Sequence, residues 1–171
     1  MLLSLVFLLL FLAVASVDGF YFHLYRYRLF ARPASRREHL LHTINSVLLV
    51  PQVYLMFCSR PQGALLGLAV LLAVAVYAVE LCDVLIENDS RRDLGGLTSA
   101  EYAMHFSMAS LRAAALIAFF ATTTLADFTA PTALLDVPWW LRIAGFCVLV
   151  PGVAAAAVHV ALALRTPTAS P

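Results

Sequence analysis

Charged residues are scarce in this sequence, and lysine is absent altogether. Only 12% of the 171 residues are charged, whereas 63% are hydrophobic, and the mean hydropathy is +0.90. A chain with so little polar surface is unsuited to a soluble domain, so the composition predicts an all-α integral membrane protein. The formal net charge of +1 gives no basis for nucleic-acid binding.

Cysteine is also rare, and its spacing excludes the usual cysteine motifs. Cys58, Cys82 and Cys147 form no CxxC pair and each lies in or beside an apolar run, so we expect small buried side chains and no disulfide framework. The first apolar run lacks a preceding basic region, which argues against a cleaved signal peptide. Without repeats or a low-complexity linker, the sequence predicts one transmembrane domain over residues 1–171.

Five apolar segments are long enough to span a bilayer, for which about 20 helical residues suffice. We expect a bundle of five transmembrane helices over about residues 2–22, 38–58, 64–87, 99–126 and 139–164. Capping boxes are predicted at Ser35–Glu38 and Thr98–Glu101, and Pro51 predicts an irregularity in the second helix. Short loops should make neighbouring helices antiparallel.

Arginines are divided unevenly between the two ends of this bundle. One end, formed by the loops after the first and third helices and by the tail, holds Arg26, Arg28, Arg32, Arg36, Arg37, Arg91, Arg92 and Arg165. The other end holds only Arg60 and Arg142. The positive-inside rule therefore predicts an outside N-terminus and a cytoplasmic C-terminus, in what we expect to be a bacterial inner membrane.

Histidines and acidic residues concentrate at the same, cytoplasmic end. At 1.5 Å of rise per residue, several of them lie in one layer roughly 6 to 10 Å inside the helices. Nitrogen and oxygen ligands on facing helices are how helical bundles build metal sites. The predicted metal ligands are Asp18, Glu38, His42, Asp83, Glu87, Glu101, His105 and His159.

Other polar residues have simpler structural interpretations. Glu38 and Glu101 can act as capping residues alone, and His23 and His39 are predicted to lie at the lipid–water boundary. A solvated loop is expected at residues 89–93, which include Arg91 and Arg92. For Glu80 we predict an ion pair with Arg112, because an unpaired guanidinium inside a membrane helix is costly.

This ligand set favours an oxidoreductase. Two metal ions, with iron favoured over zinc, would activate dioxygen and oxidise a hydrophobic small molecule that enters from the lipid bilayer. The spacing departs from the Glu-x-x-His of soluble di-iron proteins, since Glu38–His42 and Glu101–His105 are one residue longer. The similarity is therefore to a ligand set and not to a family.

Four alternatives remain open from the sequence. A zinc hydrolase would need three histidines and one carboxylate, fewer acids than the chain offers. A haem between His42 and His105 would be surrounded by unfavourable carboxylates. A transporter would use the same residue types, but the outer halves of the helices offer no continuous polar pathway. Finally, the polar cluster could only fix helix packing in a subunit of a larger membrane complex or homo-oligomer.

Overall fold

The computed structural model describes residues 1–165 and is 81% helical, which confirms the predicted all-α class. Five helical segments are long and apolar enough to cross a membrane: Leu2–Ala31, Arg36–Cys58, Ala64–Ser90, Ser99–Phe120 and Trp139–Ala163. They correspond to the five predicted segments, but the first extends to Ala31 instead of about residue 22, and the fourth is shorter than expected. The polar tail expected after Arg165 lies outside the described residues.

The regular elements follow one another along the chain in a simple order. The α-helices are α1 (Leu2–Ser16), α2 (Arg36–Val53), α3 (Ala64–Ser90), α4 (Ser99–Phe120), α5 (Leu125–Thr129) and α6 (Trp139–Ala163). Helices α1 and α2 continue as π-helical segments, Val17–Arg26 and Tyr54–Cys58, and short 3₁₀ turns span Leu29–Ala31 and Arg92–Leu94. Two short strands, β1 (Arg60–Gln62) and β2 (Ala133–Leu135), complete the fold.

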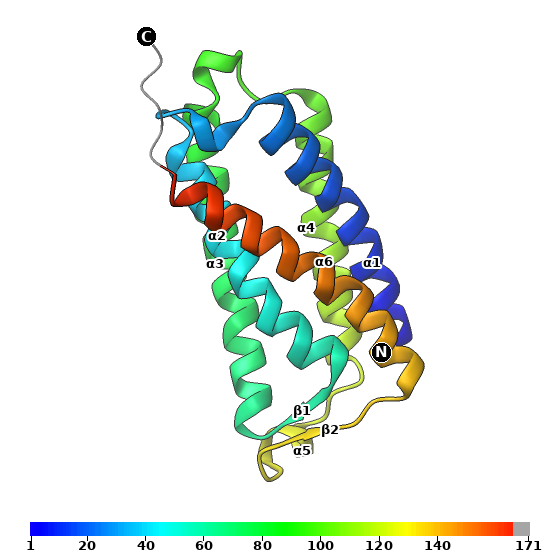
Figure 1. Ribbon diagram of the computed structural model, residues 1–171. Coiled ribbons are helices and arrows are strands. Elements are labelled where there is room, and N and C mark those ends of the chain that lie inside the picture. The colour runs from blue at the N-terminus through cyan, green and yellow to red at the C-terminus, as the bar shows by residue number, and fades with distance from the viewer. Residues whose placement is uncertain (166–171) are drawn as a thin grey trace.

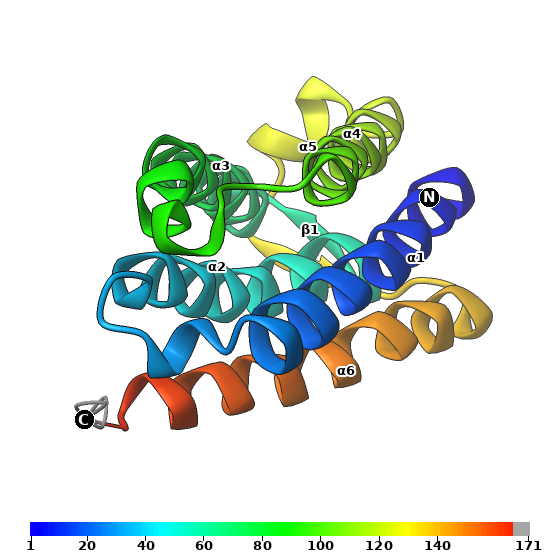
Figure 2. The same cartoon turned by 90° about the horizontal axis from the view of Figure 1, so that it is seen from above.

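The long helices form two neighbouring pairs that a fifth helix crosses. Helix α2 packs against α3 and α6, and α1 packs against α4 (Figures 1 and 2). Strands β1 and β2 pair antiparallel and close one end of the bundle, with Arg60 opposite Leu135. The first residues of the chain lie toward this end, and α6 ends at the opposite one (Figure 1). We call that opposite end the arginine-rich end, because Arg26, Arg28 and Arg91 lie in its loops and helix ends.

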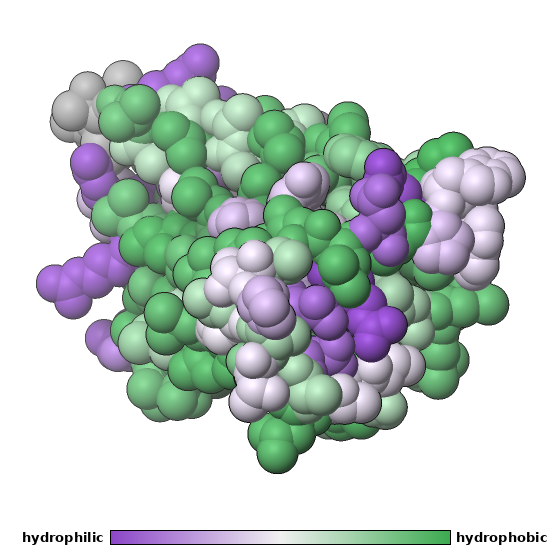
Figure 3. Space-filling model, turned by 90° about the horizontal axis from the view of Figure 1, so that it is seen from below, coloured by the Kyte–Doolittle hydropathy of each residue, from purple (hydrophilic) through white to green (hydrophobic). Residues whose placement is uncertain are grey.

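Large apolar side chains cover the outside of the helices. Leu71 is 64% exposed and Ile117 is 70% exposed, values that a water-soluble helix would reserve for polar residues. Seen from the end that carries β1 and β2, the surface is mostly hydrophobic with hydrophilic residues in limited groups (Figure 3). Such an outer surface suits contact with lipid chains.

Inside the bundle, small residues allow close contacts between helices. Ser4 on α1 is fully buried and donates to the carbonyl of Ala115 on α4 at 2.6 Å. A Cβ atom on Gly145 of α6 would lie 2.6 Å from the carbonyl oxygen of Phe57. Only glycine lets α6 approach the π-helical segment Tyr54–Cys58 so closely, a role that small residues commonly play between membrane helices.

The helix ends confirm one of three local expectations. The fourth helix was expected to reach about residue 126 but ends at Phe120, because Thr124 starts a new capping box with Asp127 and so begins α5. The predicted capping box of Thr98 and Glu101 is confirmed. The one predicted for Ser35 is wrong: Ser35 donates instead to the carbonyl of Ser90, at 2.9 Å.

Candidate metal centre

Six ionisable side chains from four helical segments meet near the arginine-rich end of the bundle. We call them the histidine–carboxylate layer. They are Asp18 and His23 on the π-helical segment Val17–Arg26, His42 on α2, Asp83 and Glu87 on α3, and His105 on α4. Five of them are among the residues that the sequence predicts as ligands, and His23 is the addition.

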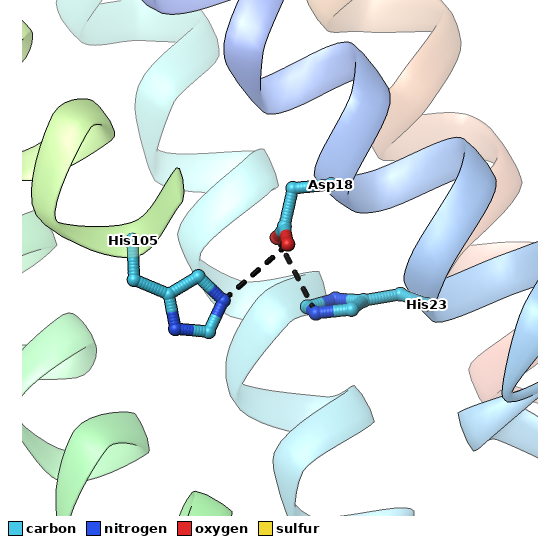
Figure 4. A group of neighbouring side chains, drawn as sticks. All are labelled: Asp18, His23 and His105. Carbon is cyan, nitrogen blue, oxygen red and sulfur yellow. Dashed lines mark ion pairs between the residues drawn. The ribbon is translucent and has the colours of Figure 1, made fainter. Parts of the chain in front are cut away.

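One half of the layer is centred on Asp18, whose carboxylate lies between two imidazoles (Figure 4). Its Oδ2 is 3.3 Å from Nε2 of His23, and its Oδ1 is 3.4 Å from Nε2 of His105. The other ring nitrogen of His105, Nδ1, is 3.2 Å from a carboxylate oxygen of Glu87. His105 thus lies between one carboxylate from the π-helical segment Val17–Arg26 and one from α3.

The other half of the layer is centred on His42. Its Nε2 lies 3.1 Å from Oδ2 of Asp83 and 4.0 Å from Oε1 of Glu38. The rings of His23 and His42 are 4.2 Å apart between centroids, so His23 joins the two halves. His23 therefore belongs to two groups of potential ligands. One group contains Asp18 and His105, and the other contains Glu38 and His42. Within each group, the potential ligand atoms all lie within 4.8 Å of one another.

These nitrogen and oxygen atoms are close but are poorly oriented for hydrogen bonds. Among the described residues, no hydrogen-bond partner is found for Nε2 of His23, His42 or His105. The same holds for Oδ1 of Asp18 and of Asp83. Buried polar atoms are normally satisfied, so a group of such atoms pointing into a common space needs a further partner. Metal ions are one such partner, since they bind the lone pairs that hydrogen bonds would otherwise use.

His23 was expected at the lipid–water boundary, but its side chain is 1% exposed and belongs to the layer. The reason is the helix type. Residues five apart on an α-helix point about 140° away from each other, which would separate Asp18 from His23. The π-helical segment Val17–Arg26 has i→i+5 bonds and wider turns, which bring both side chains to one face. A sequence analysis based on the α-helical period therefore misses His23.

Glu38 and Glu101 have a second role that the sequence did not predict. The guanidinium of Arg91, expected in a solvated loop, is 0% exposed and lies between them. It donates to Oε1 of Glu38 at 2.7 and 2.9 Å and to Oε1 of Glu101 at 2.7 Å. Burial alone would lower the pKa of Arg91, but the hydrogen bonds with Glu38 and the charges of both carboxylates raise it. We call this group the Arg91 clamp.

The clamp separates Glu101 from the layer more clearly than it separates Glu38. Glu101 also accepts a hydrogen bond from the backbone N–H of Thr98, at 3.0 Å, and one from the hydroxyl of Tyr27, at 3.1 Å. Its oxygens are therefore committed to fixing the start of α4. Glu38 still approaches His42, so it remains next to the layer while bound to Arg91.

The remaining predicted residues lie at two further places. Glu80 forms an ion pair with Arg112, as the sequence predicts, and the Arg112 guanidinium lies 4.2 Å from the centre of the Tyr77 ring. His159 is buried on α6 but stacks on His39, with 5.3 Å between ring centroids, outside the six residues of the layer. His39, expected at the interface, is 2% exposed.

A cavity of about 440 Å³ extends from the layer into the bundle. Asp18, His42, Asp83, Glu87 and His105 form part of its wall, so the same side chains face both each other and open space. A volume of this size can hold one small organic molecule. The layer is thus accessible to a ligand from inside the bundle.

Comparisons with family models, with curated proteins and with solved structures find no match for this chain. The chemical argument accordingly depends on its own residues. Three imidazoles and three carboxylates, converging beside an apolar cavity, can bind cations, transfer protons or orient a polar group of a substrate.

Proposed function

We propose that this protein is a membrane-embedded metalloprotein whose histidine–carboxylate layer binds two metal ions. The observation that carries the proposal is the convergence of imidazole nitrogens and carboxylate oxygens, 3.1 to 3.4 Å apart, without hydrogen bonds between them. Charged side chains inside membrane helices are rare and usually functional. Two divalent ions would account for both the burial of the acids and the direction of the ring nitrogens.

The two halves of the layer suggest how the ligands divide. One ion would be held by His105, Asp18 and Glu87, and the other by His42 and Asp83 with Glu38 next to them. His23 would complete one of the two sites, since it lies in both groups of potential ligand atoms. A mixture of imidazoles and carboxylates on facing helices is the ligand type of di-iron and di-manganese bundles, so iron is the favoured metal.

For the reaction, we favour oxidation of a lipid-soluble substrate by dioxygen. Paired iron ions would supply the oxidative chemistry. The chain's own residues would hold the metals, keep bulk water away through the buried positions of Asp18 and His23, and place the substrate in the adjacent apolar cavity. The support for this reaction class is the position of the cavity directly beside the layer.

The orientation proposed for the membrane follows from the arginine distribution. The arginine-rich end would face the cytoplasm, with the N-terminus outside and the protein in a bacterial inner membrane. The layer would then lie near the cytoplasmic face.

A single zinc ion with hydrolytic chemistry is the second candidate. The three imidazoles of His23, His42 and His105 are the donors that favour it, because three histidines form a common catalytic zinc site. The three carboxylates around them exceed what one zinc ion requires, so we rank this function second.

Elemental analysis of the purified protein tests the proposal directly. We expect about two iron ions, or a mixed iron–manganese pair, per chain. We also expect His105→Ala, Asp83→Ala and His23→Ala each to lower the metal content strongly, because each removes a side chain of the layer. His39→Ala is the matched control for His23→Ala: this histidine is as buried as His23 but stacks on His159 outside the layer.

The possible outcomes separate the candidates. One zinc ion per chain would replace oxidation by hydrolysis as the leading function. A folded protein that takes up no metal would overturn both and leave a polar packing network. Equal metal loss in His39→Ala would show that the effect is general misfolding and would remove the assignment to the layer.

A further inference from the structure

The cavity beside the layer has a polar end and an apolar end. Asp18, Asp83 and Glu87 line the first, and Leu49, Val53 and Val148 line the second. The Glu80–Arg112 ion pair lines the wall between these two ends, with its opposite charges paired to each other. On α6, eleven residues separate His159 from Val148, so the cavity extends about 16 Å along the bundle. At roughly 30 Å³ for each water-sized group, 440 Å³ accommodates about fifteen such groups. This shape and this division of polarity suit one extended hydrocarbon chain with a small polar head.

The same cavity reaches the outer surface between α3 and α4. Two side-chain contacts join these helices: the carboxylate of Glu87 lies 3.2 Å from Nδ1 of His105, and Glu80 forms an ion pair with Arg112. Seven residues separate the two pairs on each helix, which corresponds to about 10 Å along the helix axis. We call the space between these two contacts the lateral window.

Side chains at the lateral window face both the cavity and the surroundings of the protein. Val84 on α3 lines the cavity and is 51% exposed, and Phe106 on α4 lines it and is 75% exposed. Ala109, one turn further along α4, lines the cavity with a side chain that occupies little space. Since this surface would contact lipid chains, the opening leads into the bilayer and not into water.

The direction of the cavity also matches the direction of a membrane lipid. Its polar end lies toward the arginine-rich end of the bundle, where lipid headgroups would be, and its apolar end points toward the centre of the helices. A single-chain lipid of that leaflet could therefore move sideways through the window without turning over. Its head would arrive at the layer and its chain would occupy the apolar end.

We infer that the cavity binds a single-chain fatty-acyl lipid, which enters from the bilayer through the lateral window between α3 and α4. The inference rests on the proposed function, because this lipid would be the substrate of the metal centre. Its head and the first carbons of its chain would lie next to the layer. Binding itself depends on the cavity and not on bound metal, so the two proposals can be tested separately.

Photoaffinity labelling in phosphatidylcholine nanodiscs tests the inference. The probe is lauric acid, whose chain length matches the cavity, with a diazirine near its methyl end and an alkyne for detection, and labelled residues are identified by mass spectrometry. We expect labelling at the apolar end of the cavity, around Val53 and Val148, and at least a fivefold reduction by excess unlabelled laurate. Labelling confined to outward-facing residues such as Leu71, without competition, would overturn the inference.

Matched variants test the lateral window. Ala109→Phe should reduce the competed labelling at least fivefold because the ring fills the window, whereas Ala103→Phe, an exposed position of α4 outside the cavity, should not change it. Val84→Phe with Leu85→Phe as its control repeats the test at an exposed position, where a larger side chain is tolerated. Entry through the window would be overturned if Ala109→Phe and Ala103→Phe showed equal competed labelling, and if Val84→Phe and Leu85→Phe also did.

Metal content is measured on the same samples. Competed labelling at the cavity in a protein without metal would support the lipid site while removing the metal centre. Two metal ions per chain without competed labelling would support the metal centre and overturn the lipid site alone.

Discussion

The Arg91 clamp provides the sharpest test of the structure, because its removal has a large and specific predicted cost. Arg91 is completely buried and is shared by two buried carboxylates from different helices, Glu38 on α2 and Glu101 on α4. Replacing Arg91 by alanine would leave both carboxylates without a cation. Breaking a buried ion pair from one side costs about 3–5 kcal/mol, so we expect Arg91→Ala to lower the free energy of unfolding by about that amount.

The neighbouring arginine is the natural control. Arg92 pairs with Asp89 at 2.6 Å, but both side chains are more than three-quarters exposed. Exposed ion pairs contribute about 0–1 kcal/mol, so Arg92→Ala should change stability little. The two variants remove the same side chain from adjacent positions, one buried between two carboxylates and the other exposed beside a single one.

The measurement is reversible unfolding in mixed micelles with increasing denaturing detergent, followed by circular dichroism. A partial rescue strengthens the test: in the triple variant Arg91→Ala, Glu38→Gln, Glu101→Gln, much of the lost stability should return, because uncharged amides need no counter-ion. A loss of less than about 1 kcal/mol in Arg91→Ala, or equal losses at Arg91 and Arg92, would refute the buried clamp.

Three further outcomes follow from local geometry. Gly63→Ala should destabilise by more than about 1 kcal/mol in thermal unfolding, because φ is +58° there and the new Cβ would lie 2.6 Å from the carbonyl oxygen of Ala130. Gly145→Ala should loosen the packing of α6 for a similar steric reason. Gly67→Ala should be neutral or stabilising, because a Cβ atom there would meet open space. Equal losses of stability at all three glycines would contradict this reasoning. Backbone and side-chain hydrogen bonds from Thr124 and Gln62 lower the pKa of Asp127, so its stabilising contribution is present above the ordinary aspartate pKa of about 3.9 and is lost as the pH falls through the lower folded value. Asp127→Asn should remove that part of the acid destabilisation, and an unchanged pH dependence of unfolding would contradict it.

Much of the fold was predictable because membrane helices have a simple compositional signal. Twenty apolar residues in succession identify a span without any knowledge of its neighbours. The capping box at Thr98 was equally predictable, since it depends only on local spacing. Ser35 shows the limit of such local rules. Its hydroxyl meets the carbonyl of Ser90 from α3, and that tertiary contact replaces the local cap.

The candidate site was harder to predict in two respects. The π-helical segment changes the residue period just where Asp18 and His23 lie, and no feature of the sequence marks that change. Arg91 stands in a run that looks like an ordinary polar loop, and only the approach of α2 and α4 turns it into a buried clamp. In contrast, Glu80 and Arg112 were paired correctly, because a deep charge in a membrane helix has few possible partners.

A count of charges over the described residues explains why the layer, and no other acidic group, is the candidate for metal binding. Four acids outside it have one arginine each: Glu80 with Arg112, Asp89 with Arg92, Asp127 with Arg60 and Asp136 with Arg142. Asp93 is exposed in the loop.

The charges that remain would be balanced by the two divalent ions that we propose. Glu38 and Glu101 share the single positive charge of Arg91, which leaves one negative charge, and Asp18, Asp83 and Glu87 contribute three more. With neutral imidazoles the layer and the Arg91 clamp together therefore carry four negative charges, three of them on the layer. Two divalent cations would neutralise four charges, whereas one zinc ion would leave two uncompensated inside the bundle. Protonation of His42 and His105 would also reduce this charge, since their Nε2 atoms lie 3.1 Å from Oδ2 of Asp83 and 3.4 Å from Oδ1 of Asp18. Metal content separates this arrangement from the proposed dinuclear site. The charge count thus supports the proposed dinuclear site over a single zinc ion, and elemental analysis decides between them.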